Sequence, residues 1–235
     1  MDKRVYISIV PAVLLKLIGD QQAHAFTSDE MIVIEAIKRS DNDLVDANIE
    51  EISTYLSQYS PEQLQGISNN VKGIYHEIKF VEAENADGDD IDAELYELTN
   101  HPGADVRLTN TTTGEISDVQ LKAANSAHYV GEHLDKYPDI NVLATEEVAN
   151  NLSDVESSGF SNEELSNDVS HTLNDITDNG GYIESTAATS GLISAVLNAK
   201  AALEGKQSCS LAARKTLEDI GIATASAVII EVLIG

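Results

Sequence analysis

The chain has 235 residues, which is enough for one core domain with additional segments. Its formal net charge of −26 repels phosphate backbones over most of the surface and argues against a broad nucleic-acid-binding face. A nucleic-acid site would therefore need a bound metal ion and local Lys or Arg side chains to reverse the field. The single cysteine, Cys209, excludes an internal disulfide framework and a cysteine-based zinc site.

Residues 1–25 resemble a secretory signal. A basic start at residues 1–4 precedes an apolar run over residues 5–19, and Ala23-His-Ala25 follows. Lys16 interrupts the run, so a buried helix or strand of a cytoplasmic domain is the alternative interpretation. The run is too short and too interrupted to span a membrane. We expect a cytoplasmic protein, with a secreted or periplasmic location as the alternative if this segment is a signal.

The following stretch predicts two amphipathic helices. A capping box, Thr27-Ser-Asp-Glu30, begins a helix over residues 28–39. A second helix is expected over residues 41–59, because its apolar residues recur at helical spacing: Leu44, Ile49, Ile52 and Leu56. Residues 1–59 are thus expected to form an N-terminal helical segment.

A longer helix is predicted from residue 60. Ser60 is a typical N-cap residue, Pro61 occupies the first turn, and Gln63 completes the capping pattern. One continuous apolar stripe follows at spacings of three and four: Leu64, Ile67, Val71, Ile74, Ile78 and Val81. Glu77 lies beside this stripe, where a carboxylate either reaches solvent or is directed at a functional site.

Residues 82–94 are strongly acidic. They contain Asp87-Gly-Asp-Asp, but the glycine and the later glutamates do not have the spacing of an EF-hand loop. A solvated loop is the default interpretation, and weak calcium binding is the alternative. Alternation over residues 93–98 then predicts a first strand.

Two further short strands are predicted on either side of a polar turn at residues 110–114. Val106 and Leu108 alternate with polar residues in one strand, and Val119 and Leu121 alternate with polar residues in the other. An antiparallel pair in this register places three polar residues at neighbouring points on one face: Asp105, Gln120 and Lys122. Such a group indicates either a chemical site or an ordinary solvated sheet face.

The next elements complete a recognisable order. A helix is expected over residues 126–137, a strand over residues 140–144, and another helix from Thr145. From residue 60 the order is therefore helix, strand, strand, strand, helix, strand. His128 and His133 are five residues apart, which is not the spacing of a helical metal-ligand pair, so these and His101 are interpreted as core or surface histidines.

Over roughly residues 60–150, this order and the Asp…Gln-x-Lys pattern resemble the PD-(D/E)xK nuclease superfamily, in a Gln-x-Lys variant. Asp105 matches the metal-binding Asp of the family, and Gln120 with Lys122 matches its second motif. Glu77 matches the helix-borne Glu that many members carry. The resemblance implies an α/β (α+β) fold with a restriction-endonuclease-like αβββαβ core, and metal-dependent hydrolysis of phosphodiester bonds in nucleic acid.

The resemblance also implies a set of roles. Asp105, Glu77, the side-chain oxygen of Gln120 and the carbonyl of Leu121 would hold Mg²⁺ or Mn²⁺, since these ions prefer hard oxygen ligands. The ion would polarise the phosphate and lower the pKa of the attacking water. Lys122 would orient that water or stabilise charge on the phosphate, so the catalytic set is Asp105, Gln120 and Lys122.

The remainder of the chain has a different composition. Residues 151–182 predict an acidic polar linker with one helix, and residues 183–235 predict a hairpin of two helices rich in Ala and Gly. Gly191, Ala195 and Ala199 repeat at a spacing that lets helices approach closely. The alternative function is therefore a non-catalytic binding or assembly protein, in which residues 185–235 contact a second copy, a partner helix or a membrane surface.

Overall fold

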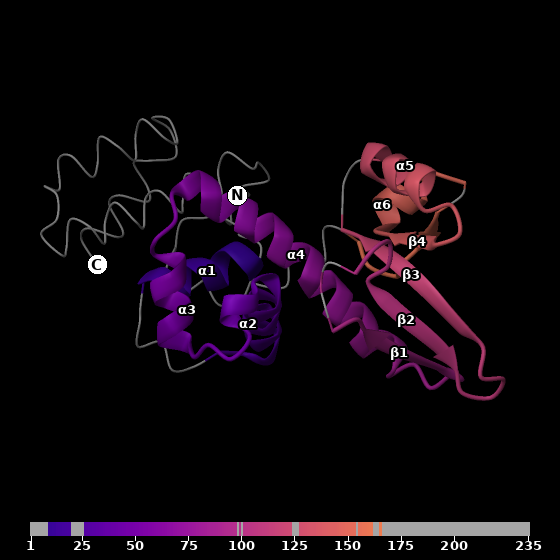
Figure 1. The fold of residues 1–235 in the computed structure, drawn as a ribbon, viewed down its shortest axis with the longest axis horizontal. Helices are drawn as coiled ribbons and strands as arrows, with labels where there is room; N and C mark the ends of the chain where they lie inside the picture. Colours follow the sequence, from indigo (N-terminus) through magenta and orange to yellow (C-terminus); the bar gives the residue numbers. More distant parts are fainter. Residues whose placement is uncertain are drawn as a thin grey trace, which may run out of the picture. The chain divides into compact units, whose positions relative to one another are not determined.

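The computed structural model describes residues 9–19, 26–97, 99, 101–123, 127–153, 155–161 and 165 (Figure 1). The helical hairpin expected over residues 183–235 lies outside the described residues, as does nearly all of the helix expected in the linker. The described residues form two compact units, which we treat separately. The helical unit holds those up to residue 34 and from 43 to 69; the sheet unit holds residues 35–42 and those from 70 to 165. No helix in these ranges is long and apolar enough to cross a membrane.

The helical unit contains α1 (Ile9–Gly19), the first part of α2 (Ser28–Ser40), and α3 (Ile49–Leu56). The apolar run at the start of the chain is buried in this unit through Val13, Leu14 and Leu17 of α1. Lys16, which interrupts that run, forms an ion pair of 3.0 Å with Glu30, a carboxylate only 2% exposed. This pairing explains how a charged residue is tolerated within an otherwise apolar buried helix.

The single helix expected over residues 41–59 is wrong. The structure has a short 3₁₀ helix (Asn42–Leu44), a loop, and then α3 from Ile49. Asn48 begins the new helix with a capping box: its side chain accepts from the Glu51 N–H at 3.0 Å, and its own N–H donates to the Glu51 carboxylate at 2.8 Å. The apolar spacing therefore identified buried residues correctly but did not reveal the break before Asn48.

The sheet unit is α/β, with a mixed sheet of five strands in the order β1-β2-β3-β4-β5 (Figure 1). The first three strands are antiparallel neighbours, whereas β4 runs parallel to β3 and β5 runs parallel to β4. The strands are β1 (Ile91–Leu95), β2 (Val106–Asn110), β3 (Ile116–Lys122), β4 (Asn141–Ala144) and β5 (Glu156–Ser157). The first strand thus begins and ends earlier than the predicted residues 93–98.

Helices cover both faces of this sheet. Phe80 of α4 (Pro61–Glu84) packs with Val106, Val119 and Leu143 in one apolar cluster. Val130 of α5 (Ala127–Lys136) and Val148 of α6 (Glu146–Ala149) pack with alternate residues of β4 in a second cluster. Side chains of successive strand residues point to opposite faces, so β4 contributes Leu143 to the first cluster and Val142 and Ala144 to the second. The order α4, β1, β2, β3, α5, β4 in the chain is the order expected from the sequence.

Candidate functional site

Asp105 lies immediately before β2 and is held against β3. Its backbone N–H donates to the Val119 carbonyl at 2.9 Å, and its Oδ2 accepts from the Leu121 N–H at 2.9 Å. The register that pairs Val106 with Val119 places Asp105 opposite Gln120. The sheet register thus fixes both the backbone and the carboxylate of Asp105, which is the geometry that a site on rigid elements requires.

Gln120 is 8% exposed and uses its amide nitrogen within the site. Its Nε2 donates to Asp105 Oδ2 and also to the Leu121 carbonyl at 3.2 Å. Two of the predicted metal ligands, the Gln120 side chain and the Leu121 carbonyl, are therefore hydrogen-bonded to each other. For the Gln120 oxygen to face the same ion as Asp105, the side-chain amide must rotate by 180°, so that its oxygen and nitrogen exchange places. This rotation also breaks the hydrogen bond to the Leu121 carbonyl.

Glu77 of α4 interacts electrostatically with Asp105. Burial and, second, the charge of Asp105 raise the pKa of Glu77 to about 8, while the charges of Arg39 and Lys122 oppose the shift. Burial also raises the pKa of Asp105, against the Leu121 N–H and the charges of Lys122 and His101. Gln120 is thus in contact with Asp105, and Glu77 and Lys122 lie within electrostatic reach of the Asp105 carboxylate.

The donor set fits a divalent cation. Glu77 and Asp105 are two carboxylates that burial and mutual repulsion keep from ionising together. A divalent ion would offset that repulsion, because it would replace the proton on Glu77 with a larger positive charge. Their oxygens, with that of Gln120 after its amide turns, are the hard ligands that Mg²⁺ and Mn²⁺ prefer.

Three further residues lie near this group: Arg39, His101 and His133. Each has one side-chain nitrogen that is buried without a hydrogen-bond partner, namely Arg39 Nε, His101 Nδ1 and His133 Nε2. The His133 ring bonds to the Gly103 carbonyl, while burial and the charge of Lys122 lower the pKa of His133. The charge of His101 acts on the Asp105 carboxylate. Both histidines are close in sequence to Asp105 or Lys122, whereas nothing in the sequence marks Arg39.

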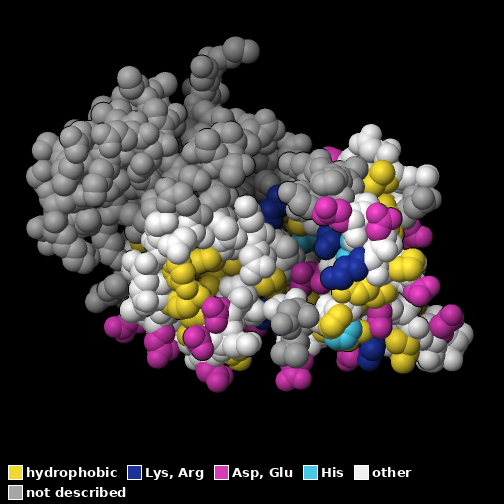
Figure 2. All heavy atoms as spheres, turned by 45° about the horizontal axis from the view of Figure 1, so that its top comes forward, with side chains coloured by type: hydrophobic (Ala, Val, Ile, Leu, Met, Phe, Trp, Pro, Cys, Tyr) yellow, Lys and Arg dark blue, Asp and Glu magenta, His cyan; other side chains and the backbone are white. Residues whose placement is uncertain are grey.

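Figure 2 shows the charge environment on one face of the described surface. Acidic side chains are spread over this face, whereas Lys, Arg and His side chains lie near one another over part of it. A few basic side chains thus lie close together, beside acidic ones, in a chain that is strongly acidic as a whole.

Gly103 determines the path of the loop that carries Asp105. Its φ is +84°, and a Cβ at this position would lie 2.7 Å from Ile140 Cδ1 and 2.8 Å from Tyr137 Cδ1. Gly103→Ala is therefore expected to lower the free energy of unfolding by about 2–3 kcal/mol, from left-handed strain and the clash together, and to displace Asp105. Urea unfolding and metal affinity measure these two effects.

Gly114→Ala is the matched control for that loop variant. Gly114 has a φ of +74° in the β2–β3 turn, but a Cβ there would meet nothing within 4 Å. Gly114→Ala should lower the free energy of unfolding by about 1 kcal/mol, which is the cost of backbone strain alone, and should leave the metal affinity unchanged. If Gly103→Ala proves no worse than Gly114→Ala in either measurement, the packing of the loop against Tyr137 and Ile140 does not position Asp105.

A second polar pair lies in the interior of the sheet unit. His76 Nε2 and Ser158 Oγ are 2.8 Å apart, and His76 is 0% exposed. Burial and the charge of Lys72 lower the pKa of His76 to about 4, so the ring is neutral at physiological pH. Because both side chains are buried, this pair ties α4 to the segment after β5 and offers no open nucleophile.

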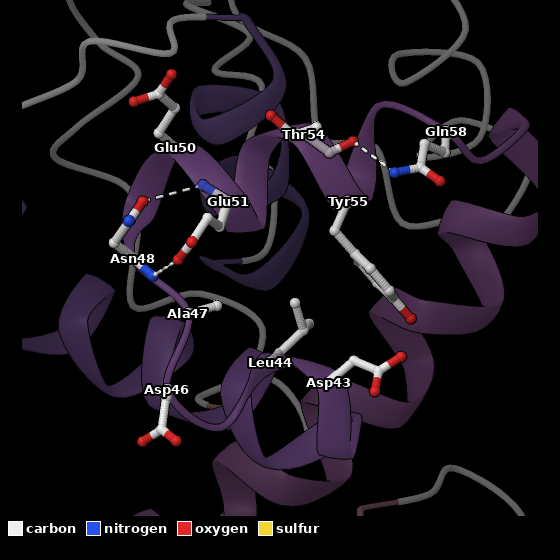
Figure 3. A pocket seen from close by; sticks show the side chains of 10 residues that line it. All are labelled: Asp43, Leu44, Asp46, Ala47, Asn48, Glu50, Glu51, Thr54, Tyr55 and Gln58. Atoms are coloured by element: carbon white, nitrogen blue, oxygen red, sulfur yellow. Dashed lines mark hydrogen bonds between the residues drawn. The ribbon is translucent and has the colours of Figure 1, made fainter.

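Two other acidic places occur among the described residues. Glu84, Asp87 and Asp89 have carboxylate oxygens within 4.8 Å of one another at the end of α4, in the stretch where weak calcium binding was considered. A hollow of about 690 Å³ in the helical unit is lined by acidic residues and Tyr55 (Figure 3). In Figure 3, Glu51 caps the helix through Asn48. Neither the cluster nor the hollow has buried carboxylates next to a basic side chain, as the site around Asp105 does.

Comparisons with known proteins give no relative: no protein-family model matches the sequence, and no curated protein or solved structure is significantly similar to it.

Proposed function

We propose that the sheet unit is a metal-dependent phosphodiesterase that cleaves nucleic acid, a Gln-x-Lys variant of the PD-(D/E)xK nucleases with their restriction-endonuclease-like core. The observation that carries the proposal is the gathering of Glu77, Asp105, Gln120 and Lys122, with the pKa of Glu77 raised to about 8 by burial and by Asp105. The order α4, β1, β2, β3, α5, β4 and the strand pairing agree with this assignment.

Each residue of the site would have its own role in the reaction. Glu77 and Asp105 would hold the cation, and Gln120 would add its oxygen once the amide turns. The bound Mg²⁺ or Mn²⁺ supplies positive charge that polarises the phosphate and acidifies the attacking water. The Lys122 ammonium donates hydrogen bonds to that water or to a phosphate oxygen, which orients the attack and stabilises the charge that develops. The Leu121 N–H keeps Asp105 in place throughout.

The first experiment is cleavage of labelled single-stranded and double-stranded DNA and RNA by the purified full chain. We expect hydrolysis in Mg²⁺ or Mn²⁺ and none in EDTA, because the carboxylate pair needs a divalent ion to act on an anionic substrate. Gel or fluorescence assays measure the products. Cleavage that persists in EDTA, or no cleavage of any of these substrates with either ion, contradicts the proposal.

A further inference from the structure

We propose that Arg39 binds a phosphate of the nucleic-acid substrate in this site. The inference rests on the proposed function, and it adds a residue that lies outside the αβββαβ elements and that no motif in the sequence marks. This contact would help a protein with a large negative charge to bind a polyanion.

The backbone after β1 sets the orientation of the Arg39 side chain. Arg39 lies in the last turn of α2, and its Nη2 donates to the Tyr96 carbonyl at 2.7 Å. The Thr99 hydroxyl donates to the Arg39 carbonyl at 3.2 Å, which joins the same segment to the end of α2. A guanidinium anchored through one N–H keeps its remaining donors in a fixed plane.

Hydrogen bonds through Tyr96 join Arg39 to the site. The Tyr96 carbonyl accepts from Arg39 Nη2 at 2.7 Å, and the Tyr96 N–H donates to the Asp105 carbonyl at 3.2 Å. The Arg39 Nε is nevertheless buried without a hydrogen-bond partner. A buried donor without a partner is unfavourable, so the Arg39 Nε–H needs an acceptor, which a ligand bound at the neighbouring site would supply.

A phosphate is the acceptor that fits. The fork of a guanidinium matches two oxygens of one phosphate, whereas an ammonium provides only a point charge. The net charge of −26 repels a polyanion over most of the surface, so such a contact should contribute strongly to substrate binding.

The test compares Arg39→Met and Arg39→Lys with wild type on the oligonucleotide that wild type cleaves fastest, over a range of salt concentrations. We expect Arg39→Met to raise KM about tenfold or more while kcat changes less than about threefold. The slope of log KM against log salt should fall in magnitude by about 0.7–0.9, which is the loss of one phosphate contact. Arg39→Lys should keep the slope but not the full affinity. The control is Lys38→Met, which removes a charge from the preceding residue of α2 and should leave KM near the wild-type value.

The outcomes separate this inference from the proposed function. If wild type cleaves, and a well-folded Arg39→Met keeps the wild-type KM and salt slope, Arg39 binds no phosphate and only the inference fails. If Arg39→Met does not fold, as judged by circular dichroism, Arg39→Lys decides: a wild-type KM with this variant overturns the bidentate contact. If wild type cleaves no nucleic acid, the proposed function fails and the inference fails with it.

Discussion

Asp105→Asn is expected to lower kcat/KM for nucleic-acid cleavage by about a thousandfold or more. Asparagine has nearly the same shape and can still accept the hydrogen bond from the Leu121 N–H, so the loop should keep its position. The variant removes the negative charge that would hold the cation, and with it the electrostatic stabilisation of the reaction. Steady-state kinetics in Mg²⁺ and Mn²⁺ measure the loss.

Asp118→Asn is the matched control for the Asp105 variant. Asp118 lies on β3 and pairs with Arg107 at 3.1 Å, outside the group formed by Glu77 and Lys122. The same substitution there should change kcat/KM less than about threefold, since an exposed ion pair contributes little. Equal effects of the two substitutions, or wild-type cleavage by Asp105→Asn, would remove Asp105 from the mechanism.

Glu77→Gln is expected to abolish a large pH dependence of stability in the metal-free protein. The pKa of Glu77 is about 8 in the folded chain, against an ordinary value of 4.5. Between these values the folded state binds more protons than the unfolded state, so stability is full below pH 4.5 and is lost as the pH rises through 8. The loss between pH 5 and pH 9 is on the order of 4 kcal/mol, and the Gln variant should not show it.

Urea unfolding in EDTA at several pH values measures this effect. Asp105→Asn should shrink the pH dependence, because the Asp105 charge contributes to the raised pKa of Glu77. The control is Glu82→Gln on the same helix, where the carboxylate is exposed, and this variant should follow wild type. Parallel curves for wild type and Glu77→Gln would mean that Glu77 is not held in a buried carboxylate pair.

Period-two alternation was sufficient to predict the strand pair at the centre of the site. Residues that alternate with Val106 and Val119 had to share a face, and the observed register puts Asp105 opposite Gln120. The strand pair involves adjacent strands only, which is why pattern alone could predict it. The apolar stripe of α4 placed Glu77 beside a buried face but left open whether its carboxylate reached solvent, and the family resemblance selected it as a site residue.

Other features depend on contacts distant in sequence or on single side-chain hydrogen bonds. Arg39 reaches the site from α2 through the Tyr96 carbonyl, and no periodic pattern encodes that contact. The break before α3 depends on the reciprocal hydrogen bonds of Asn48 and Glu51, within a stretch that was predicted to be one helix. The Gln120 amide presents its nitrogen to Asp105, a detail set by the local donors and acceptors rather than by residue type.

Binding of Mn²⁺ followed by electron paramagnetic resonance is the most direct test of the central claim. All proteins in this experiment should also carry Asp87→Asn and Asp89→Asn. These two substitutions prevent the acidic cluster of Glu84, Asp87 and Asp89 from holding the ion. We expect the protein with these two substitutions alone to bind one Mn²⁺, and we expect Asp105→Asn or Glu77→Gln to weaken that binding at least about tenfold. Mn²⁺ binding that neither Asp105→Asn nor Glu77→Gln weakens, or no Mn²⁺ binding in the protein with Asp87→Asn and Asp89→Asn alone, would show that Glu77 and Asp105 do not form a metal centre.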